Sequence, residues 1–344
     1  MEQKLISICI PTYSRPLELK RLLESIDTTK VDDVDIVISE NCSPKQAETR
    51  AVVEAYKLNS KYEVHYFENE KNYGYDRNIR ELIKRATGKF CVFFSDDDLF
   101  MPGAMDQFVE FIRAHQDCGY ILRSYRNYAP NGVDYQEFRY YRTDKEFPAG
   151  ENTAIELFDK SVFLSGFTIR QEYASQYETD AIDSTLLYQM YPLLEVCLRY
   201  PSAYSRIIIS KAVSEAGGVH YFGESDNEKD SFTAGKMQGN NDINFMKKYF
   251  VFFDFVEKHF NKRMADSLRK NFSKYSSYPI MMRQLPYCKN RKEKRAFFKE
   301  LEGSGMNASV YYYLYKIAFT VLGVKGFKKI VFAIKSKLGH RPKL

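Results

Sequence analysis

The chain has 344 residues, of which 44% are hydrophobic and 28% charged; this is ordinary globular usage and excludes disordered, collagen-like and fibrous classes. A chain of this length is expected to form about two domains. The formal net charge is only +6, but residues 283–344 contain 15 lysines and arginines against three acidic residues. Such a basic tail favours an anionic partner, either a membrane surface or a nucleic acid.

Cysteine usage and hydropathy indicate a cytoplasmic protein. The six cysteines are scattered with no CxxC pair, so we expect neither a zinc site nor a disulfide framework. Met1 leads within a few residues into an apolar run that is too short for a signal peptide. The longest apolar stretch, residues 310–324, has 15 residues and contains Lys316, whereas a membrane-spanning helix needs about 20. We therefore expect no membrane-spanning segment.

Short β-branched runs alternate with amphipathic segments over the first 125 residues. The pattern predicts strands at 5–10, 34–39, 62–67, 90–94 and from 120, and helices at 17–26, 45–58, 76–86 and 106–114. This alternation predicts an α/β fold with a mostly parallel sheet flanked by helices. Ligands of such sheets bind beyond the carboxyl ends of the strands, so the residues that follow each strand are site candidates.

The rest of the chain is less regular. Residues 127–149 are polar and tyrosine-rich, which predicts loops and hairpins. Beyond them the pattern predicts helices at 154–163 and 185–199, a strand at 204–210, a mobile loop near a site at 217–241, and helices from 245 to the end. We accordingly divide the chain into residues 1–125, 126–241 and a basic helical region, 242–344.

Three consecutive carboxylates, Asp96, Asp97 and Asp98, directly follow the strand predicted at 90–94. Adjacent carboxylates repel one another unless a cation or several hydrogen-bond donors lie beside them. Hard oxygen ligands suit Mg²⁺ or Mn²⁺, usually together with substrate phosphates. A solvated acidic turn is the alternative interpretation.

Four strings place these carboxylates in a wider pattern: ISICIPTYSRPLELKRLLESI, IVISENCS, NEKNYGYDRNI and ATGKFCVFFSDDDLFMPGAM. Together they resemble the nucleotide-sugar half of family-2 glycosyltransferases, over roughly the first 115 residues. The SENCS and SDDD variants are most similar to the abequosyltransferase-like branch, which builds bacterial surface polysaccharides. The resemblance implies the GT-A (Rossmann-like) fold and a nucleoside-diphosphate sugar as donor.

The resemblance also implies roles for residues that contact the nucleotide. Pro11, Thr12 and Tyr13 would line the base pocket after the first strand. Glu40 matches the acidic residue that accepts from the N3–H of the base, where most relatives have aspartate.

A second segment, Asn72, Gly74, Arg77 and Asn78, matches the Asn-x-Gly segment of the family. Asn72 and Arg77 would contact the nucleotide sugar. An ordinary surface arginine is the alternative for Arg77.

For the metal, Mn²⁺ or Mg²⁺, the resemblance implies that Asp96 faces the ribose and the ion. Asp97 would bind the ion that bridges the two phosphates, with Asp98 as a further candidate. Relatives commonly have an additional aspartate where this chain has Ser95. His220 would close over the metal or the diphosphate, and an exposed loop histidine is the alternative.

Transfer of a sugar also requires a base that takes the proton of the acceptor hydroxyl. In the family this base is an aspartate that lies 85–95 residues past the acidic motif, at the start of a helix. Asp183 lies 86 residues after Asp97, just before the helix predicted at 185–199, and Asp180 is the reserve candidate. The alternative role for Asp183 is a helix N-cap.

The end of the chain contains one more pattern. Five apolar positions share one face of a helix: Phe327, Ile330, Val331, Ile334 and Leu338. The neighbouring lysines lie off this face, which is typical of basic amphipathic helices on anionic bilayers. The alternative is a helix that docks on the body of the protein with its lysines outward.

Our leading hypothesis is an inverting, metal-dependent glycosyltransferase that acts on a lipid-linked glycan acceptor at the cytoplasmic face of the membrane. The alternative is a non-catalytic binder of nucleotide sugars or polyanions, in which Asp183 is only a cap and the tail binds nucleic acid. The apolar face of the tail favours lipid, so we expect no nucleic-acid partner. The first strand is followed by no GxGxxG, which excludes a dinucleotide-dependent oxidoreductase.

Overall fold

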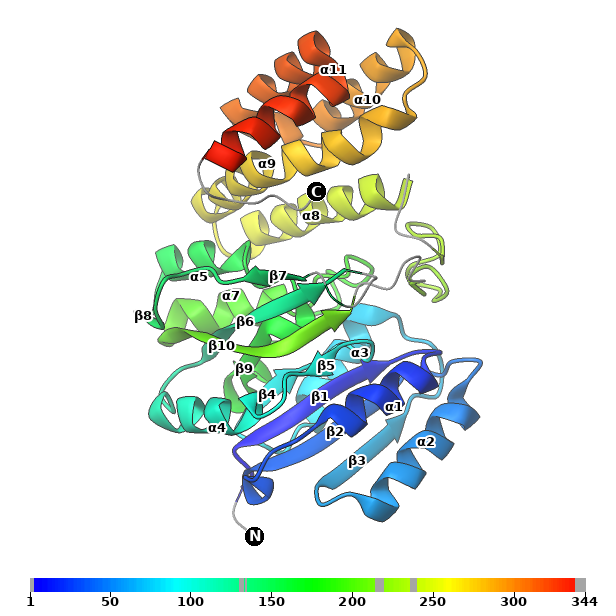
Figure 1. Cartoon of the computed structure of the whole chain (residues 1–344), viewed down its shortest axis with the longest axis vertical. Coiled ribbons are helices and arrows are strands. Elements are labelled where there is room, and N and C mark those ends of the chain that lie inside the picture. Colours follow the sequence, from blue (N-terminus) through cyan, green and yellow to red (C-terminus); the bar gives the residue numbers. More distant parts are fainter. Residues whose placement is uncertain (1–2, 130–132, 134, 214–219, 236–239, 338–344) are drawn as a thin grey trace. The chain divides into compact units, whose positions relative to one another are not determined.

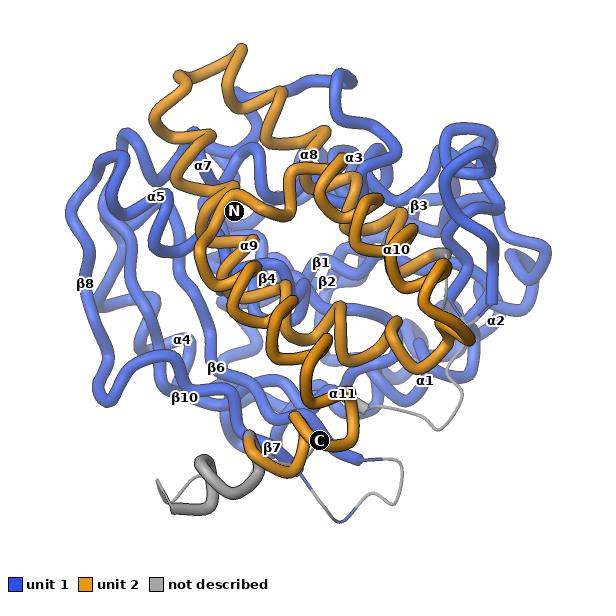
Figure 2. Tube along the Cα trace, turned by 90° about the horizontal axis from the view of Figure 1, so that it is seen from above, with its two compact units in different colours: residues 1–237 blue, residues 238–344 orange. Residues whose placement is uncertain are grey.

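The computed structural model describes residues 3–129, 133, 135–213, 220–235 and 240–337 (Figure 1). The chain divides into two compact units, residues 1–237 and 238–344 (Figure 2). The division of the first 241 residues at position 125 stays a prediction.

Within the described residues, the first unit contains a ten-stranded sheet. Eight strands follow one another in the order β3-β2-β1-β4-β9-β6-β10-β5, while β7 pairs with β6 and β8 pairs with β10. The strands that run in one direction are β1 (Ile6–Thr12), β2 (Val34–Glu40), β3 (Glu63–Glu68), β4 (Phe90–Phe93), β6 (Tyr120–Tyr128) and β10 (Ser202–Val213). The antiparallel strands are β5 (Leu99–Phe100), β7 (Tyr135–Phe138), β8 (Lys145–Phe147) and β9 (Phe167–Arg170), and β9 separates β4 from β6. The α/β fold with a mostly parallel sheet is thus confirmed.

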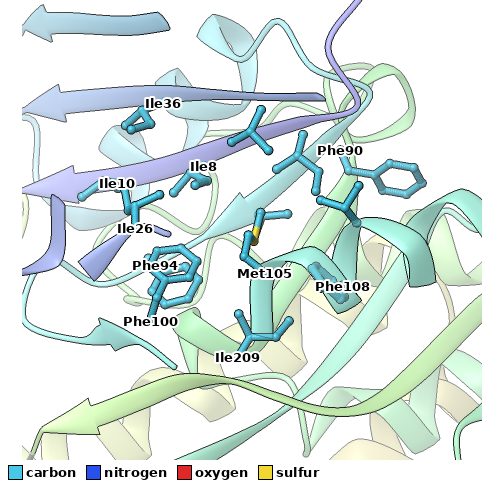
Figure 3. Close-up of a cluster of buried hydrophobic side chains, with 14 of the residues drawn as sticks. Ile8, Ile10, Ile26, Ile36, Phe90, Phe94, Phe100, Met105, Phe108 and Ile209 are labelled. Atoms are coloured by element: carbon cyan, nitrogen blue, oxygen red, sulfur yellow. The ribbon is translucent and has the colours of Figure 1, made fainter. Parts of the chain in front are cut away.

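Helices cover both faces of the sheet near β1. Strands β1 and β2 are buried along almost their whole length, as expected for parallel strands with helices on both sides. On one face, α1 (Pro16–Ser25), α2 (Gln46–Asn59) and α4 (Ala104–Ala114) contribute side chains to a hydrophobic cluster. Figure 3 shows part of this cluster. Helix α3 (Tyr75–Arg85) contacts β1 and β2 on the face away from α1 (Figure 1).

The cluster explains why these strands contain so many apolar residues. Ile8, Ile10 and Ile36 belong to one cluster with Met105 and Phe108 of α4 (Figure 3) and are fully buried. Burying one such side chain stabilises a fold by about 1.5–3 kcal/mol. The cluster fixes the strands, and therefore also the polar residues at their carboxyl ends.

The region before β10 differs from the sequence-based prediction. The helix expected at 185–199 begins only at Met190, as α7 (Met190–Arg199), and residues 184–189 form a loop. Ser184 and Leu186 have φ of 72° and 62°, which lies outside the helical range. The helix expected at 154–163 is α5 (Glu151–Phe158). Strand β9 and the short α6 (Gln171–Ala174) were not predicted.

The second unit is helical, as the sequence predicts. It contains α8 (Asn240–His259), α9 (Lys262–Gln284), α10 (Arg291–Gly303) and α11 (Val310–Lys337). The side chains of Asn261 and Asn290 cap α9 and α10 by accepting from backbone N–H groups. Gly323, with φ of 65°, kinks α11. Within the residues described, no helix is long and apolar enough to cross a membrane.

Candidate functional site

A pocket of about 350 Å³ opens where β1, β2 and β4 end. It brings together seven of the residues predicted for the site: Pro11, Thr12, Tyr13, Asn72, Asp96, Asp97 and His220. Further lining residues are Arg15, Asn41, Gly74, Tyr75, Asn78, Ser95, Leu164, Tyr221, Phe222 and Glu228. The carboxyl ends of neighbouring parallel strands therefore form one pocket, as this sheet class predicts.

The acidic residues after β4 are tied to the end of β1. Thr12 Oγ1 donates to Asp96 at 2.8 Å. One guanidinium nitrogen of Arg15 donates to Asp96 at 3.0 Å and to Asp97 at 2.7 Å. Burial raises the pKa of Asp96 to about 6, and the positive charge of Arg15 opposes this rise. The side chain of Asp97 is 39% exposed, so it presents a carboxylate to the open side of the pocket.

These two carboxylates fit a divalent ion. Because one nitrogen of Arg15 contacts both, Asp96 and Asp97 face a common cation position. The described part of the chain contains no group of three or more His, Cys, Asp or Glu side chains that could hold a metal ion. Mg²⁺ is commonly held by only one or two carboxylates together with substrate phosphates. Asp96 and Asp97 therefore suit an ion that completes its ligand shell from a diphosphate.

The other two predicted metal contacts differ. Asp98 does not line the pocket; it is buried and accepts a hydrogen bond from Ser165 Oγ. His220 does line the pocket, where its ring stacks on Phe222 with 5.2 Å between ring centroids. Its backbone pairs with Gly235. The lining of the pocket thus includes His220 but not Asp98.

Residues 220–235 close one side of the pocket. Tyr13 Oη donates to Glu224 at 2.8 Å, and the rings of Tyr13 and Tyr221 lie 5.6 Å apart. Glu228 accepts from Tyr75 N at 2.7 Å and from Gly223 N at 3.1 Å. This segment is part of the predicted loop at 217–241, of which residues 217–219 and 236–239 lie outside the described residues.

Glu40 and Arg77, predicted to contact the nucleotide, do not line the pocket. The carboxylate of Glu40 accepts from Cys42 N at 2.8 Å, Ser43 N at 2.9 Å and Gln46 Nε2 at 3.0 Å, so it orders its own loop. The guanidinium of Arg77 stacks on the Tyr73 ring at 3.7 Å.

Asn41, next to Glu40, lines the pocket instead. Its amide donates to Asn72 at 2.9 Å and to the carbonyl of Gly74 at 3.2 Å. These bonds join the end of β2 to the segment that precedes α3.

Asp183 lies in the loop between α6 and α7, seven residues before α7 begins, so the expected helix-start position is wrong. Arg80 donates to both of its oxygens, at 3.0 and 3.3 Å. Burial raises the pKa of Asp183, and the charge of Arg80 opposes the rise. Asp180 is exposed, and its carbonyl accepts from Asp183 N. Neither aspartate lines the pocket.

Sequence reasoning missed three residues of this region: Arg15, Asp76 and Arg80. Arg15 lies within the string PTYSRP, only two positions after the predicted base segment. Asp76 and Arg80 lie in YDRNIR, the same segment as Arg77, one residue before it and three residues after it. Their partners lie far away in the chain, which is why no local pattern showed their roles.

Comparisons with known proteins find relatives in sequence and in fold. Residues 7–170 match the model of Glycosyl transferase family 2. The abequosyltransferase RfbV of Salmonella typhimurium is 29% identical over 168 residues, 47% of each chain. The GalNAc(5)-diNAcBac-PP-undecaprenol beta-1,3-glucosyltransferase of Campylobacter jejuni is 28% identical over 107 residues, 30% of this chain and 33% of its own. The chain thus spans less than half the length of these curated relatives.

Solved structures share the fold at low identity. TarS residues 1–349 of S. aureus, in complex with UDP-GlcNAc, covers 94% of this chain and 92% of its own, with a TM-score of 0.61 and 12% identity. The mannosyltransferase PcManGT of Pyrobaculum calidifontis, with GDP-Man and Mn²⁺, covers 97% and 87%, with a TM-score of 0.50 and 11% identity. Residues 7–170 therefore form a domain similar to glycosyltransferase family 2, and the chain shares the GT-A fold of these solved structures.

Proposed function

We propose that this protein is an inverting, metal-dependent glycosyltransferase that moves a sugar from a nucleoside-diphosphate donor to a lipid-linked glycan during synthesis of a bacterial surface polysaccharide. The observation that carries the proposal is the pair Asp96 and Asp97, which share one cation position at the mouth of the pocket. The nucleotide-sugar complexes of TarS and PcManGT support the class of donor. The undecaprenol in the name of the Campylobacter relative supports the class of acceptor.

In this mechanism the chain binds, orients and moves a proton. Thr12 and Arg15 hold Asp96 and Asp97 in place for Mn²⁺ or Mg²⁺, which when bound would neutralise charge on the leaving diphosphate. Tyr13 and Asn72 line the space for the nucleotide, and residues 220–235 exclude water from one side. Asp183 takes the proton of the acceptor hydroxyl, since Arg80 keeps a carboxylate oriented there.

A donor screen tests the activity. The purified full chain is incubated with a panel of nucleoside-diphosphate sugars and Mn²⁺, and release of nucleoside diphosphate is measured. We expect one base and sugar combination to dominate, and the Asp97→Asn variant to show no release with it. Binding of a nucleotide sugar without any turnover, with lipid-linked acceptor present, would instead favour the non-catalytic binder. The anomeric configuration of the product, determined by NMR, tests inversion.

We further propose that α11 lies on the inner face of the cell membrane. Four side chains along one face of α11 are strongly exposed: Val310 65%, Leu314 55%, Ile317 61% and Val321 75%. Exposed apolar stripes beside lysines are typical of helices at anionic bilayers. The stripe lies before Gly323, whereas the sequence pattern favoured residues 327–338.

That later part of α11 is only partly described. Phe327 packs on the ring of Phe319 at 4.8 Å and is half-buried. Leu338 lies outside the described residues, as do the side chains of residues 331–337. The stripe at 310–321 is therefore the apolar surface on which the membrane proposal rests.

Co-sedimentation with vesicles tests this surface. We expect the full chain to bind vesicles with anionic lipid and to dissociate as salt is raised, because screening shortens the Debye length from about 10 Å at 0.1 M to about 3 Å at 1 M. The double variant Ile317→Glu with Val321→Glu should lose binding. Leu58→Glu is the matched control, since Leu58 is 85% exposed but lies on α2. Equal binding by all three proteins would exclude α11 as the anchor.

A further inference from the structure

Residues 180–189, here called the base loop, carry Asp183 and need external support. The loop contains two non-glycine residues in the left-handed region, Ser184 and Leu186. Each such residue costs about 1–2 kcal/mol relative to a right-handed conformation. The loop's own backbone bonds are single turns, such as Asp183 N to Asp180 O at 3.0 Å and Thr185 N to Ile182 O at 3.1 Å. Contacts with another element must therefore stabilise the loop in this conformation.

Asp76, in the first turn of α3, supplies two such contacts. One of its carboxylate oxygens accepts from Leu186 N at 2.9 Å, and the other accepts from Tyr188 N at 2.8 Å. The side chain is 2% exposed, so water does not replace these bonds. An unpaired buried N–H costs about 1–3 kcal/mol. Asp76 thus holds the backbone of the base loop directly at and after the left-handed Leu186.

Arg80, one turn further along α3, holds the other side of the loop. It donates to both oxygens of Asp183 and to the carbonyl of Thr179. Because residues four apart lie on the same face of a helix, Asp76 and Arg80 reach the loop together. They differ in one respect: Arg80 contacts the carboxylate of Asp183, whereas Asp76 contacts only the backbone.

The same helix begins at the donor pocket. Gly74 and Tyr75 line the pocket, and Tyr75 N donates to Glu228 of the segment that closes it. One rigid element, α3 (Figure 1), therefore contacts both the space for the donor and the loop for the base. A displacement of the first turn of α3 would change both.

We propose that Asp76 is a positioning residue, which fixes Asp183 for proton transfer by bonding the backbone of the base loop. This inference rests on the proposed role of Asp183 as the base. Among the described residues, Asp76 makes no hydrogen bond to Asp183 or to the acidic pair, so its direct contact with the base loop is through the backbone at Leu186 and Tyr188. Loss of Asp76 should therefore lower turnover while donor affinity changes little.

A double-mutant cycle tests the inference on the full chain with its best donor and acceptor. Asp76→Asn, Asp183→Asn and the double variant are compared for kcat, for donor KM, and for donor affinity by calorimetry. We expect Asp76→Asn to lower kcat by about 10- to 100-fold while KM stays within about twofold. Asparagine keeps one acceptor oxygen, but its NH₂ group is a donor and cannot accept from the second backbone N–H. In the Asp183→Asn background the same change should have no further effect on kcat.

Asp106→Asn is the matched control. Asp106 also lies in the first turn of a helix, α4, and also accepts from a loop backbone, Thr29 N at 2.8 Å, but it lies outside the pocket lining. The Asp106→Asn variant should be less stable than the wild type but keep its kcat. Asp76→Glu, which keeps both acceptor oxygens and the charge, should retain more kcat than Asp76→Asn; it also replaces the asparagine variant if that variant does not fold.

The outcomes separate the two claims. Full additivity of Asp76→Asn and Asp183→Asn, or unchanged kcat in Asp76→Asn, would overturn the positioning role and leave Asp183 as the base. Wild-type kcat in Asp183→Asn would overturn the assignment of the base and the positioning role with it. A change confined to donor KM would show that α3 acts on the pocket rather than on the base loop, which also overturns the inference.

Discussion

The acidic pair after β4 and the base loop hold their aspartates in different ways. Asp96 and Asp97 lie at the end of a strand whose parallel neighbour, β1, leads directly to Thr12 and Arg15. Asp183 lies in an irregular loop tied to a helix side chain that is 103 residues away in the chain. Backbone pairing therefore assembles the first region, whereas two buried side chains of α3 stabilise the second. Distant substitutions that displace Asp183 should therefore leave the acidic pair in place.

The largest effect should come from the acidic pair itself. Asp97→Asn should lower transfer on the order of 10³-fold or more, because a bound metal contributes several kcal/mol of charge stabilisation. The fold should survive, since Asp97 is 39% exposed. EDTA should abolish activity and Mn²⁺ or Mg²⁺ restore it. Asp27→Asn, at 75% exposure, is the control, and full activity in EDTA would contradict the metal-dependent mechanism.

The next effect concerns the base loop. Asp183→Asn should lower kcat by about 10²- to 10⁴-fold, as loss of a general base does, while donor affinity stays near that of the wild type. Asp180→Asn is the control, because Asp180 is exposed and contributes a backbone carbonyl rather than a carboxylate contact to Asp183. An inactive Asp180→Asn beside an active Asp183→Asn would move the base by three residues.

A moderate effect should show whether the Arg15 guanidinium and the metal ion share one position beside Asp96 and Asp97. Arg15→Ala leaves Asp96 and Asp97 without the guanidinium and should lower the free energy of unfolding in EDTA by about 1–3 kcal/mol. This is less than the about 3–5 kcal/mol of fully buried pairs, because Arg15 is 22% exposed. Mn²⁺ should then raise the Tm of the variant more than that of the wild type. Equal shifts in both proteins would mean that Arg15 and the ion do not share a position.

The smallest effect is a pH dependence that involves Asp76. Burial raises the pKa of Asp76 to about 7, with Glu228 and Asp183 adding to the rise and the two backbone bonds opposing it; Arg80 lies one turn along the helix. Between pH 4 and 7 the folded protein holds a proton that the unfolded chain has released, so this group stabilises the fold less as pH rises. The difference in unfolding free energy between wild type and Asp76→Asn should therefore shrink from pH 5 to pH 8.

Urea unfolding at several pH values measures this difference. Asp106→Asn provides the comparison, because hydrogen bonds from Thr28 and Thr29 lower the pKa of Asp106. Its difference from wild type should stay constant above pH 5. A difference for Asp76→Asn that also stays constant from pH 5 to pH 8 would show that Asp76 is ionised throughout this range.

The two regions also differ in how well the sequence predicts them. The alternation of apolar strands and amphipathic helices, with SDDD after the fourth strand, predicts the sheet and the acidic pair. Arg15 was missed because its role depends on a neighbouring strand. Glu40 binds its own loop because the glutamate side chain reaches forward to the backbone of Ser43. Pattern reasoning is strongest where partners lie at adjacent strand ends.

The base loop shows where such reasoning fails. The apolar run at 185–199 has helical spacing, but Ser184 and Leu186 take positive φ, which no side-chain pattern reveals. Pro192 does indicate where α7 begins. Because proline is tolerated in the first turn of a helix but not in its interior, the helix should start shortly before residue 192. The bonds from Asp76 to the loop span 110 and 112 residues, so only the folded chain shows them.

Strand β9 has a consequence for synthesis of the chain on the ribosome. It pairs with β4 and β6, but it can do so only after residues 167–170 have left the ribosome. Until then one edge of β4 has no partner, and an unpaired strand edge is a template for association with another chain. N-terminal fragments that end between residues 129 and 166 should therefore aggregate, whereas those that extend past residue 170 can pair both edges of β4. Insertion of slow codons just before position 167 should increase aggregation of the nascent protein.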